Sequence, residues 1–142
     1  MLTEKLNALG VKGRQVGQLQ RGETVRVGDL LVRPEDVSVV KEGRCLVTVF
    51  DTRLCQSAVD LARDADVLVC ESQFESSLQE KADAFMHMTV TDACRLAQLA
   101  GVKRLVLSHF SQRYKTLDVI EDQAKAAFGN VELARDFLVV KV

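Results

Sequence analysis

The feature that most constrains the fold is the alternation, from Cys45 onward, of short apolar runs with longer segments of helical periodicity. Near-continuous apolar runs are typical of strands covered on both faces, and strands that alternate with helices predict a parallel sheet with covering helices. We therefore expect an α/β fold. The expected elements are strand 45–50, helix 55–64, strand 66–70, a loop or short helix at 74–85, helix 90–100, strand 103–108, helix 117–127 and strand 136–141.

The segment 90–100 has the clearest helical pattern. Thr89 or Thr91 provides an N-cap, and Gly101 provides a stop. Between them an apolar stripe repeats at the helical period. The stripe consists of Ala93, Leu96, Ala97 and Ala100.

The first forty residues have a different pattern. Thr3 and Gly10 read as the cap and the stop of a short helix. From Val11 to Val40 the sequence is punctuated by glycine, and the runs ETVRV and DLLVRP predict two short strands joined at Val27-Gly28-Asp29. We expect these two strands to form a small antiparallel pair.

Composition narrows the possible functions. A chain of 142 residues, 47% of them hydrophobic and without a break in composition, is expected to form a single domain over 1–142. The 19 Lys and Arg nearly balance the 20 Asp and Glu, so no chain-wide basic field would attract nucleic acid or an anionic membrane. Aromatic residues make up only 5%, which argues against a platform on which successive bases stack.

The cysteines and the N-terminus indicate a cytoplasmic protein. Cys45, Cys55, Cys70 and Cys94 form no C-x-x-C pair, and all but Cys55 lie in apolar runs, so we expect reduced core cysteines. The start MLTEKLNALG lacks the pattern of a secretion signal, and no apolar run approaches the ~18 residues of a membrane span. The expectation is a soluble protein with no membrane partner.

Three expected strands end in residues that can carry chemistry: RCLVTVF leads to Asp51, DVLVC to Glu71 and KRLVLS to His109. Parallel strands present their carboxyl ends to a shared crevice, so these three side chains are expected to converge. His87 lies in a neighbouring loop just before helix 90–100 and completes the set. For each of these residues a purely structural interpretation also stays open. Asp51 also suits a turn, Glu71 suits either interpretation equally, and a histidine at a helix entrance such as His87 is usually structural.

Taken together, two carboxylates and two imidazoles suit a divalent metal or acid–base chemistry. The set is short of ligands, because a catalytic zinc site normally takes three protein ligands per ion and an open position. No phosphate-binding glycine loop of the G-x-x-x-x-G-K-[ST] or G-x-G-x-x-G type occurs, and no G-x-S-x-G supports a serine hydrolase.

The order of motifs resembles the C-terminal half of ribonuclease Z, the tRNA 3′-processing endonuclease of the metallo-β-lactamase fold. GRCLVTVFDTR resembles the family's strand that ends in Gly-Asp-Thr, and VLSHFSQRY matches its Thr-His-x-Ser-x-Arg-Tyr segment. DADVLVCESQF resembles its His-Glu-Ala-Thr segment, FMHMTVTDA its His-Ser-Thr segment, and LARDF its Ala-x-Asp-x segment. The resemblance implies half of an αββα sandwich, with a connector and β excursion at 1–42 and the α/β half at 43–142.

The resemblance also implies roles for individual residues. Asp51 would bridge two zinc ions, and His109 would be a terminal ligand of one of them. Manganese is the alternative metal. Glu71 and His87 would form a hydrogen-bonded catalytic pair in which His87 helps to protonate the leaving oxygen. Precursor tRNA is the implied substrate. The residues implied to position it are Ser111, Arg113, Tyr114 and Asp136, the last within Ala134-Arg135-Asp136.

Several family features have no counterpart. The His-x-His-x-Asp-His motif and other ligands belong to a preceding half, so the chain alone is expected to be inactive and to need that half, or a second copy in a homodimer, as partner. Phe50 replaces the usual glycine before Asp51, and Met88 replaces a small residue. The alternative is a non-catalytic interaction module that keeps the fold. A stand-alone flavodoxin-type or receiver-type domain fits less well, because its acidic pair and late lysine are missing.

Overall fold

The computed structural model describes all 142 residues, which divide into two compact units, Met1–Gly43 and Arg44–Val142. The boundary coincides with the change from glycine-punctuated sequence to alternating strands and helices. That the chain folds as a single domain stays a prediction. The larger unit carries the residues of interest.

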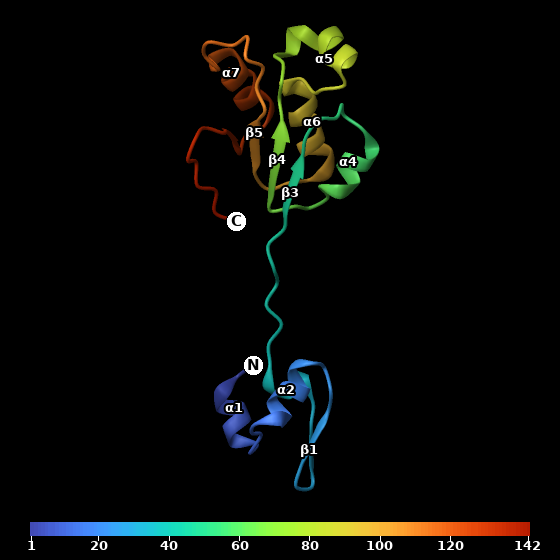
Figure 1. Cartoon of the computed structure of the whole chain (residues 1–142), viewed down its shortest axis with the longest axis vertical. Coiled ribbons are helices and arrows are strands. Elements are labelled where there is room, and N and C mark those ends of the chain that lie inside the picture. Colours follow the sequence, from blue (N-terminus) through green and yellow to red (C-terminus); the bar gives the residue numbers. More distant parts are fainter. The chain divides into compact units, whose positions relative to one another are not determined.

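The larger unit is built on a sheet of four parallel strands in the order β3-β4-β5-β6 (Figure 1). The strands are β3 (Leu46–Val49), β4 (Val67–Glu71), β5 (Leu105–Ser108) and β6 (Val131–Leu133). The connections contain α4 (Gln56–Leu61), the short 3₁₀ helix Ser76–Leu78, α5 (Gln79–Phe85), α6 (Val90–Ala100) and α7 (Asp118–Ala127). The expected parallel α/β architecture is confirmed, because helices join successive parallel strands.

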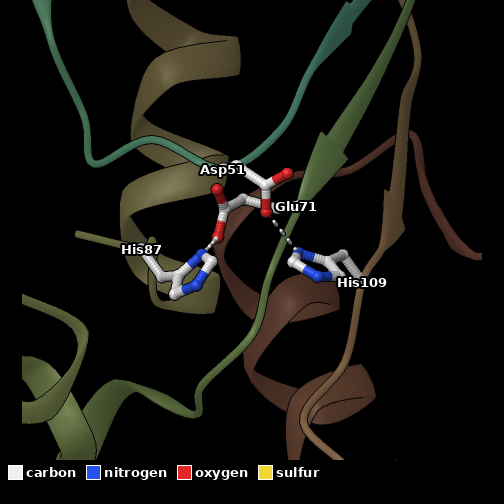
Figure 2. Close-up of side chains that lie close together, drawn as sticks. All are labelled: Asp51, Glu71, His87 and His109. Atoms are coloured by element: carbon white, nitrogen blue, oxygen red, sulfur yellow. Dashed lines mark hydrogen bonds and ion pairs between the residues drawn. The ribbon is translucent and has the colours of Figure 1, made fainter. Parts of the chain in front are cut away.

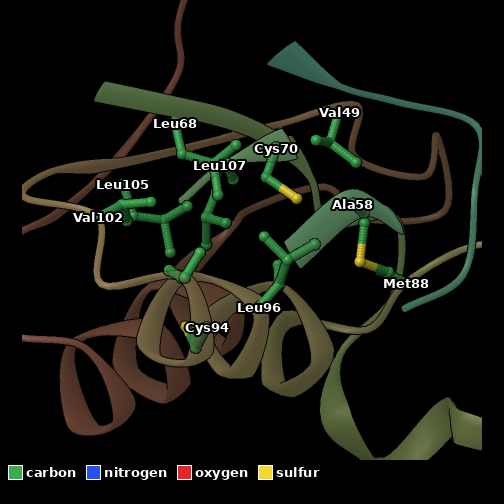
Figure 3. Packing of buried hydrophobic residues seen from close by; sticks show 14 of the residues in the cluster. Val49, Ala58, Leu68, Cys70, Met88, Cys94, Leu96, Val102, Leu105 and Leu107 are labelled. Carbon is green, nitrogen blue, oxygen red and sulfur yellow. The ribbon is translucent and has the colours of Figure 1, made fainter. Parts of the chain in front are cut away.

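The core lies between the sheet and α6 (Figure 3). Leu68 of β4 and Leu107 of β5 are fully buried there, opposite Leu96 of α6. All members of the predicted apolar stripe of α6 are buried. A fully buried leucine side chain contributes about 1.5–3 kcal/mol through the hydrophobic effect, so this layer anchors the strands that carry the site.

The expectation that both faces of every strand are covered was wrong for β3. Its burial alternates: Val47 and Val49 are buried, whereas Thr48 is exposed and Leu46 is 52% exposed. β3 forms one edge of the sheet, and one of its faces lacks cover. In the central strands the expectation holds better, since Val67 and Val106 are buried on the face opposite α6.

The ends of α6 follow from local side-chain chemistry. The Thr89 hydroxyl accepts a hydrogen bond from the Asp92 backbone N–H at 3.2 Å, and the Asp92 carboxylate accepts one from the Thr89 N–H at 3.1 Å. This reciprocal capping box satisfies two N–H groups that the helix leaves free. Gly101 ends the helix with φ +67°, a backbone region that suits glycine. Of the two predicted caps, Thr89 is the correct one.

The strand expected at 136–141 was wrong, because the last strand is β6, five residues earlier at Val131–Leu133. Ala134 continues this contact through its N–H to the Leu107 carbonyl, at 2.7 Å. Beyond it Phe137 has φ +64° and is fully exposed, which interrupts the extended backbone. The apolar letters FLVV predict a strand, but no neighbour pairs with them.

The smaller unit contains the predicted hairpin. β1 (Val25–Val27) pairs antiparallel with β2 (Leu30–Val32) around Gly28, whose φ is +60°. The helix α1 (Thr3–Ala8) was expected, although its N-cap is Leu2 rather than Thr3. The sequence did not predict α2 (Arg14–Gln20) or α3 (Pro34–Val37), because α2 contains Gly17 and α3 is a single turn.

The cysteine expectation was partly correct. All four cysteines are free, and Cys70 and Cys94 are buried. Burial raises the pKa of the Cys94 thiol to about 11. Cys45 is exposed, contrary to expectation, because it lies just before the edge strand β3. Cys55 is half-buried at the start of α4, where a hydrogen bond with the Ser57 hydroxyl lowers its thiol pKa.

Asp66 ties the starts of three strands together. Its carboxylate accepts hydrogen bonds from the Lys103 ammonium at 2.8 Å, the Cys45 backbone N–H at 2.8 Å and the Arg44 guanidinium at 3.2 Å. Lys103 precedes β5 and Cys45 precedes β3. The Lys103 hydrogen bond, followed by that of the Cys45 N–H, lowers the Asp66 pKa to about 2.

Replacing Asp66 by asparagine should therefore lower the stability of the chain at neutral pH but not at very low pH. The folded-state pKa is about 2 against 3.8 for an unperturbed aspartate, so the stabilisation is present above pH 3.8 and disappears as the pH falls through about 2. Thermal unfolding of wild type and D66N between pH 2 and pH 7 checks this. Equal melting temperatures at pH 7 would contradict the role of Asp66.

Candidate functional site

The parallel register of β3, β4 and β5 brings their carboxyl ends to one edge of the sheet. Val49 pairs with Cys70, and Glu71 pairs with Ser108. Asp51, Glu71 and His109 therefore emerge side by side, and His87 joins them from the loop between α5 and α6 (Figure 2). One possible ligand atom from each of the four lies within 4.8 Å of the others. The predicted convergence of these four residues is confirmed.

The backbone at two of these positions has an uncommon conformation. Asp51 has φ +52° and His109 has φ +56°. Such left-handed conformations cost non-glycine residues about 1–3 kcal/mol and occur at functional sites when the surrounding structure enforces them. The two side chains are thereby turned toward each other just after their strands end (Figure 2).

Glu71 is fully buried and accepts three hydrogen bonds. One carboxylate oxygen, Oε1, accepts from the Thr52 backbone N–H at 2.7 Å. The other, Oε2, lies 2.8 Å from His87 Nδ1 and accepts from the Met88 backbone N–H at 3.1 Å. A buried carboxylate is costly unless such donors surround it, so this arrangement explains how Glu71 is tolerated at the end of β4.

His109 and Asp51 form the exposed side of the cluster. His109 Nδ1 lies 3.7 Å from Asp51 Oδ1, longer than a hydrogen bond. Two ligands of one tetrahedral zinc ion, each about 2.1 Å from the metal, would be roughly 3.4 Å apart, which is close to this separation. The side chains are 40% and 76% exposed, so both are accessible to a metal ion or a substrate.

The donor set fits a divalent metal of the zinc or manganese type. Imidazole nitrogen suits zinc, and carboxylate oxygen suits both zinc and manganese. Glu71 already accepts three hydrogen bonds, which leaves Asp51 and His109 as the more available ligands. His87 Nδ1 is engaged by Glu71, so its second ring nitrogen, Nε2, is the one free to act on a substrate.

Aromatic rings border the cluster. The Phe50 ring lies edge to face against His109, with centroids 6.3 Å apart, and the rings of His87 and His109 are 5.4 Å apart. A shallow hollow is lined by Phe50, Asp51, Ser108 and His109. Phe50 is 42% exposed, so its side chain occupies space that a glycine would leave open.

The residues predicted to bind substrate have different surroundings. Arg113 is exposed, with its guanidinium 5.1 Å from the centre of the Phe74 ring and its Nε donating to the Ser111 hydroxyl at 3.3 Å. The Tyr114 hydroxyl accepts a hydrogen bond from the Glu75 backbone N–H at 2.9 Å, which gives Tyr114 a structural contact. Their roles toward a substrate stay predictions.

Asp136 lies in the segment after β6 and is exposed. It makes no hydrogen bond or ion pair with the four clustered residues, which are joined only to one another and to neighbouring backbone. The structure thus brings together the predicted metal ligands and the catalytic pair, but it does not join Asp136 to them.

Three contacts of the site were not predicted. The backbone N–H groups of Thr52 and Met88 both donate to Glu71, and the Phe74 ring lies 6.5 Å from that of His87. Backbone donors leave no signature in the sequence, because any residue except proline provides one. Phe74 had a signal, since it follows Glu71 closely in CESQF, but an apolar ring there also suits the core.

Comparison with known proteins relates this chain to a protein family. The chain matches no family model. It is 41% identical over 143 aligned positions to the ribonuclease Z of Methanothermobacter thermautotrophicus, an alignment that covers 99% of this chain and 47% of the relative. The chain is related to ribonuclease Z. It spans about half the length of the curated relatives that it matches.

Solved structures agree with the relationship to ribonuclease Z and with the fold. A long-form RNase Z from yeast aligns with a TM-score of 0.53 at 27% identity, over 61% of this chain and 12% of that one. The metallo-β-lactamase fold protein YhfI from Bacillus subtilis aligns with a TM-score of 0.56 at 26% identity, over 63% of this chain and 36% of that one. The predicted resemblance and the partial metallo-β-lactamase fold are confirmed. No helix has the length and apolar character needed to cross a membrane.

Proposed function

We propose that this chain supplies half of the active site of a metal-dependent endoribonuclease that removes the 3′ trailer from precursor tRNA. The observation that carries the proposal is the convergence of Asp51, Glu71, His87 and His109 at the carboxyl edge of the sheet. The relationship to ribonuclease Z supplies the reaction and the RNA substrate. Zinc, or manganese in its place, is the proposed cofactor, with two ions in the complete enzyme.

Asp51 and His109 are the proposed metal ligands of this chain. Asp51 is well suited to bridge two ions, because its exposed carboxylate offers two oxygens, and His109 Nδ1 faces it. When bound, such ions activate a water molecule and stabilise charge on the phosphate. Two ligands leave each ion short of the three that a catalytic zinc site normally takes, so this chain alone is expected to be inactive.

The catalytic pair is the buried Glu71 with His87. The Glu71 carboxylate holds Nδ1 of His87 at 2.8 Å and thereby fixes the orientation of the ring. Protonated His87 would then donate a proton from Nε2 to the oxygen that leaves the phosphate. Arg113, Ser111, Tyr114 and Asp136 are proposed to position the RNA, with the exposed Arg113 guanidinium as the phosphate contact.

The remaining ligands are proposed to come from a polypeptide that corresponds to the other half of ribonuclease Z, or from a second copy of this chain. The edge strand β3, with its exposed Leu46, offers a surface for either partner. If a second copy is the partner, light scattering should give a dimer at high concentration. A monodisperse monomer would contradict the homodimer and leave the separate half.

Replacing Asp51 by alanine should abolish cleavage. The assay mixes this chain with a polypeptide for the other half of a related ribonuclease Z and follows release of the 3′ trailer from a precursor tRNA in zinc or manganese. We expect cleavage by the wild-type mixture, and a loss of at least about 100-fold with D51A, because loss of even an outer-shell partner of a ligand typically costs 10–100-fold and Asp51 is a direct ligand.

Asp122 provides the matched control, since it is an exposed aspartate on α7 without a hydrogen-bond partner. D122A should cleave like wild type. Cleavage by D51A at the wild-type rate would refute the metal-ligand role, and no cleavage by any mixture would count against the proposed reaction.

A non-catalytic interaction module is the second candidate, and Phe50 is the observation that favours it. Its ring borders the hollow that contains Asp51 and His109 and fills space on one side of them. If the chain is catalytic, F50G should open the site and raise cleavage in the same mixture by about tenfold, equivalent to about 1.4 kcal/mol. If neither wild type nor F50G cleaves RNA or takes up metal, the module is the better interpretation.

A further inference from the structure

We propose that Glu71 is a positioning residue for Asp51 as well as for His87, so that one buried carboxylate holds both the metal-binding turn and the proton donor. The inference rests on the proposed function for the roles of Asp51 and His87. It goes beyond that function because Glu71 would then govern metal affinity without touching the metal.

Glu71 contacts the turn after β3 that contains Asp51. Glu71 Oε1 accepts a hydrogen bond from the backbone N–H of Thr52, the residue that follows Asp51, at 2.7 Å. A hydrogen bond to a carboxylate is shorter and stronger than one between neutral groups. This bond connects the end of β4 to the loop after β3, two segments that are 19 residues apart in the sequence.

This hydrogen bond supports an uncommon backbone conformation at Asp51. Asp51 has φ +52°, which an aspartate adopts only at a cost in free energy. Such a conformation persists when neighbouring contacts enforce it. The Thr52 N–H belongs to the peptide unit that follows Asp51, so its bond to Glu71 restrains the backbone of Asp51 and thereby the direction in which the Asp51 side chain leaves the turn.

Both carboxylate oxygens of Glu71 already accept hydrogen bonds. Oε2 binds His87 Nδ1 at 2.8 Å and the Met88 N–H at 3.1 Å, and Glu71 itself has no exposed surface. A carboxylate surrounded in this way acts on its neighbours rather than on a metal ion. Loss of such an outer partner typically reduces metal affinity 10–100-fold.

Glu71 could position His87 alone, or it could position His87 and also hold the turn at Asp51. If Glu71 acts only through His87, then H87A and E71A should leave the turn at Asp51 equally intact. If Glu71 also holds the turn, E71A should release the Thr52 N–H, whereas H87A should keep it. The readout that distinguishes them is hydrogen exchange of the Thr52 amide, which does not require metal or substrate.

The experiment measures amide hydrogen exchange by NMR in the full chain for wild type, E71A, E71Q, H87A and a control. Ser72 supplies the control, because it is buried beside Glu71 and its hydroxyl has no hydrogen-bond partner. S72A should exchange like wild type. We expect the Thr52 amide of E71A to exchange at least about tenfold faster, the change that a loss of about 1.4 kcal/mol in local stability produces.

E71Q keeps the inference testable if E71A does not fold. Its amide has one acceptor oxygen and one donor nitrogen, so it cannot accept hydrogen bonds on both sides. Protection should therefore fall at Thr52 or at Met88. Wild-type exchange at both amides in E71Q, or at Thr52 in folded E71A, would overturn the inference.

Titration of the same variants with zinc separates this inference from the proposed function. We expect E71A to bind zinc 10–100-fold more weakly than wild type, with H87A close to wild type. If no variant binds zinc, the two ligands of this chain do not hold the ion without the other half, and the exchange rates at Thr52 still decide whether Glu71 holds the turn. If wild type binds zinc and E71A binds it equally well, the positioning role is overturned while the metal site stands.

Discussion

The site depends on the in-register pairing of the parallel strands β3, β4 and β5. Because the pairing aligns Val49 with Cys70 and Glu71 with Ser108, the residues that follow each strand emerge at the same edge. The burial of Leu68, Leu96 and Leu107 fixes the strands against α6 and so maintains this alignment. A slip of one residue in a strand would reverse the faces of its side chains and break both the core and the site.

The opposite edge of the same sheet is held by a charged network. Asp66 draws together the approaches to β3 and β5 through Cys45 and Lys103. Glu71 has the corresponding place at the carboxyl edge, where it joins the loops that carry Asp51 and His87. The difference is burial: the Asp66 side chain keeps 12% of its surface exposed, whereas Glu71 is fully enclosed and depends entirely on its donors.

Much of the larger unit could be predicted from the sequence because its signals are local. Apolar runs identify β3, β4 and β5, and the capping residues of α6 give its limits. The convergence of Asp51, Glu71 and His109 follows from the parallel topology, whereas His87 reaches them from the loop between α5 and α6. The last strand was misplaced because FLVV has the composition of a strand without a partner, and pairing is a property of the fold rather than of the segment.

The contacts that organise the site could not be predicted in the same way. The N–H groups of Thr52 and Met88 serve Glu71 as backbone donors, for which side-chain identity is almost irrelevant. The relationship to ribonuclease Z covers nearly the whole chain but about half of the relative, so it identifies the family resemblance and not the complete set of ligands. The roles of individual residues toward RNA are likewise beyond what local patterns encode.

The left-handed backbone at Asp51 has a consequence for which amino acids the position can accept. Glycine adopts φ near +50° freely and asparagine, like aspartate, tolerates it better than most residues, whereas valine and isoleucine do so only under severe steric strain. Substitutions at this position therefore form two groups: those that remove the negative charge while preserving the turn, and those that distort the turn as well. A survey of tolerated residues would separate the demand of the backbone from the demand of the chemistry at a single position.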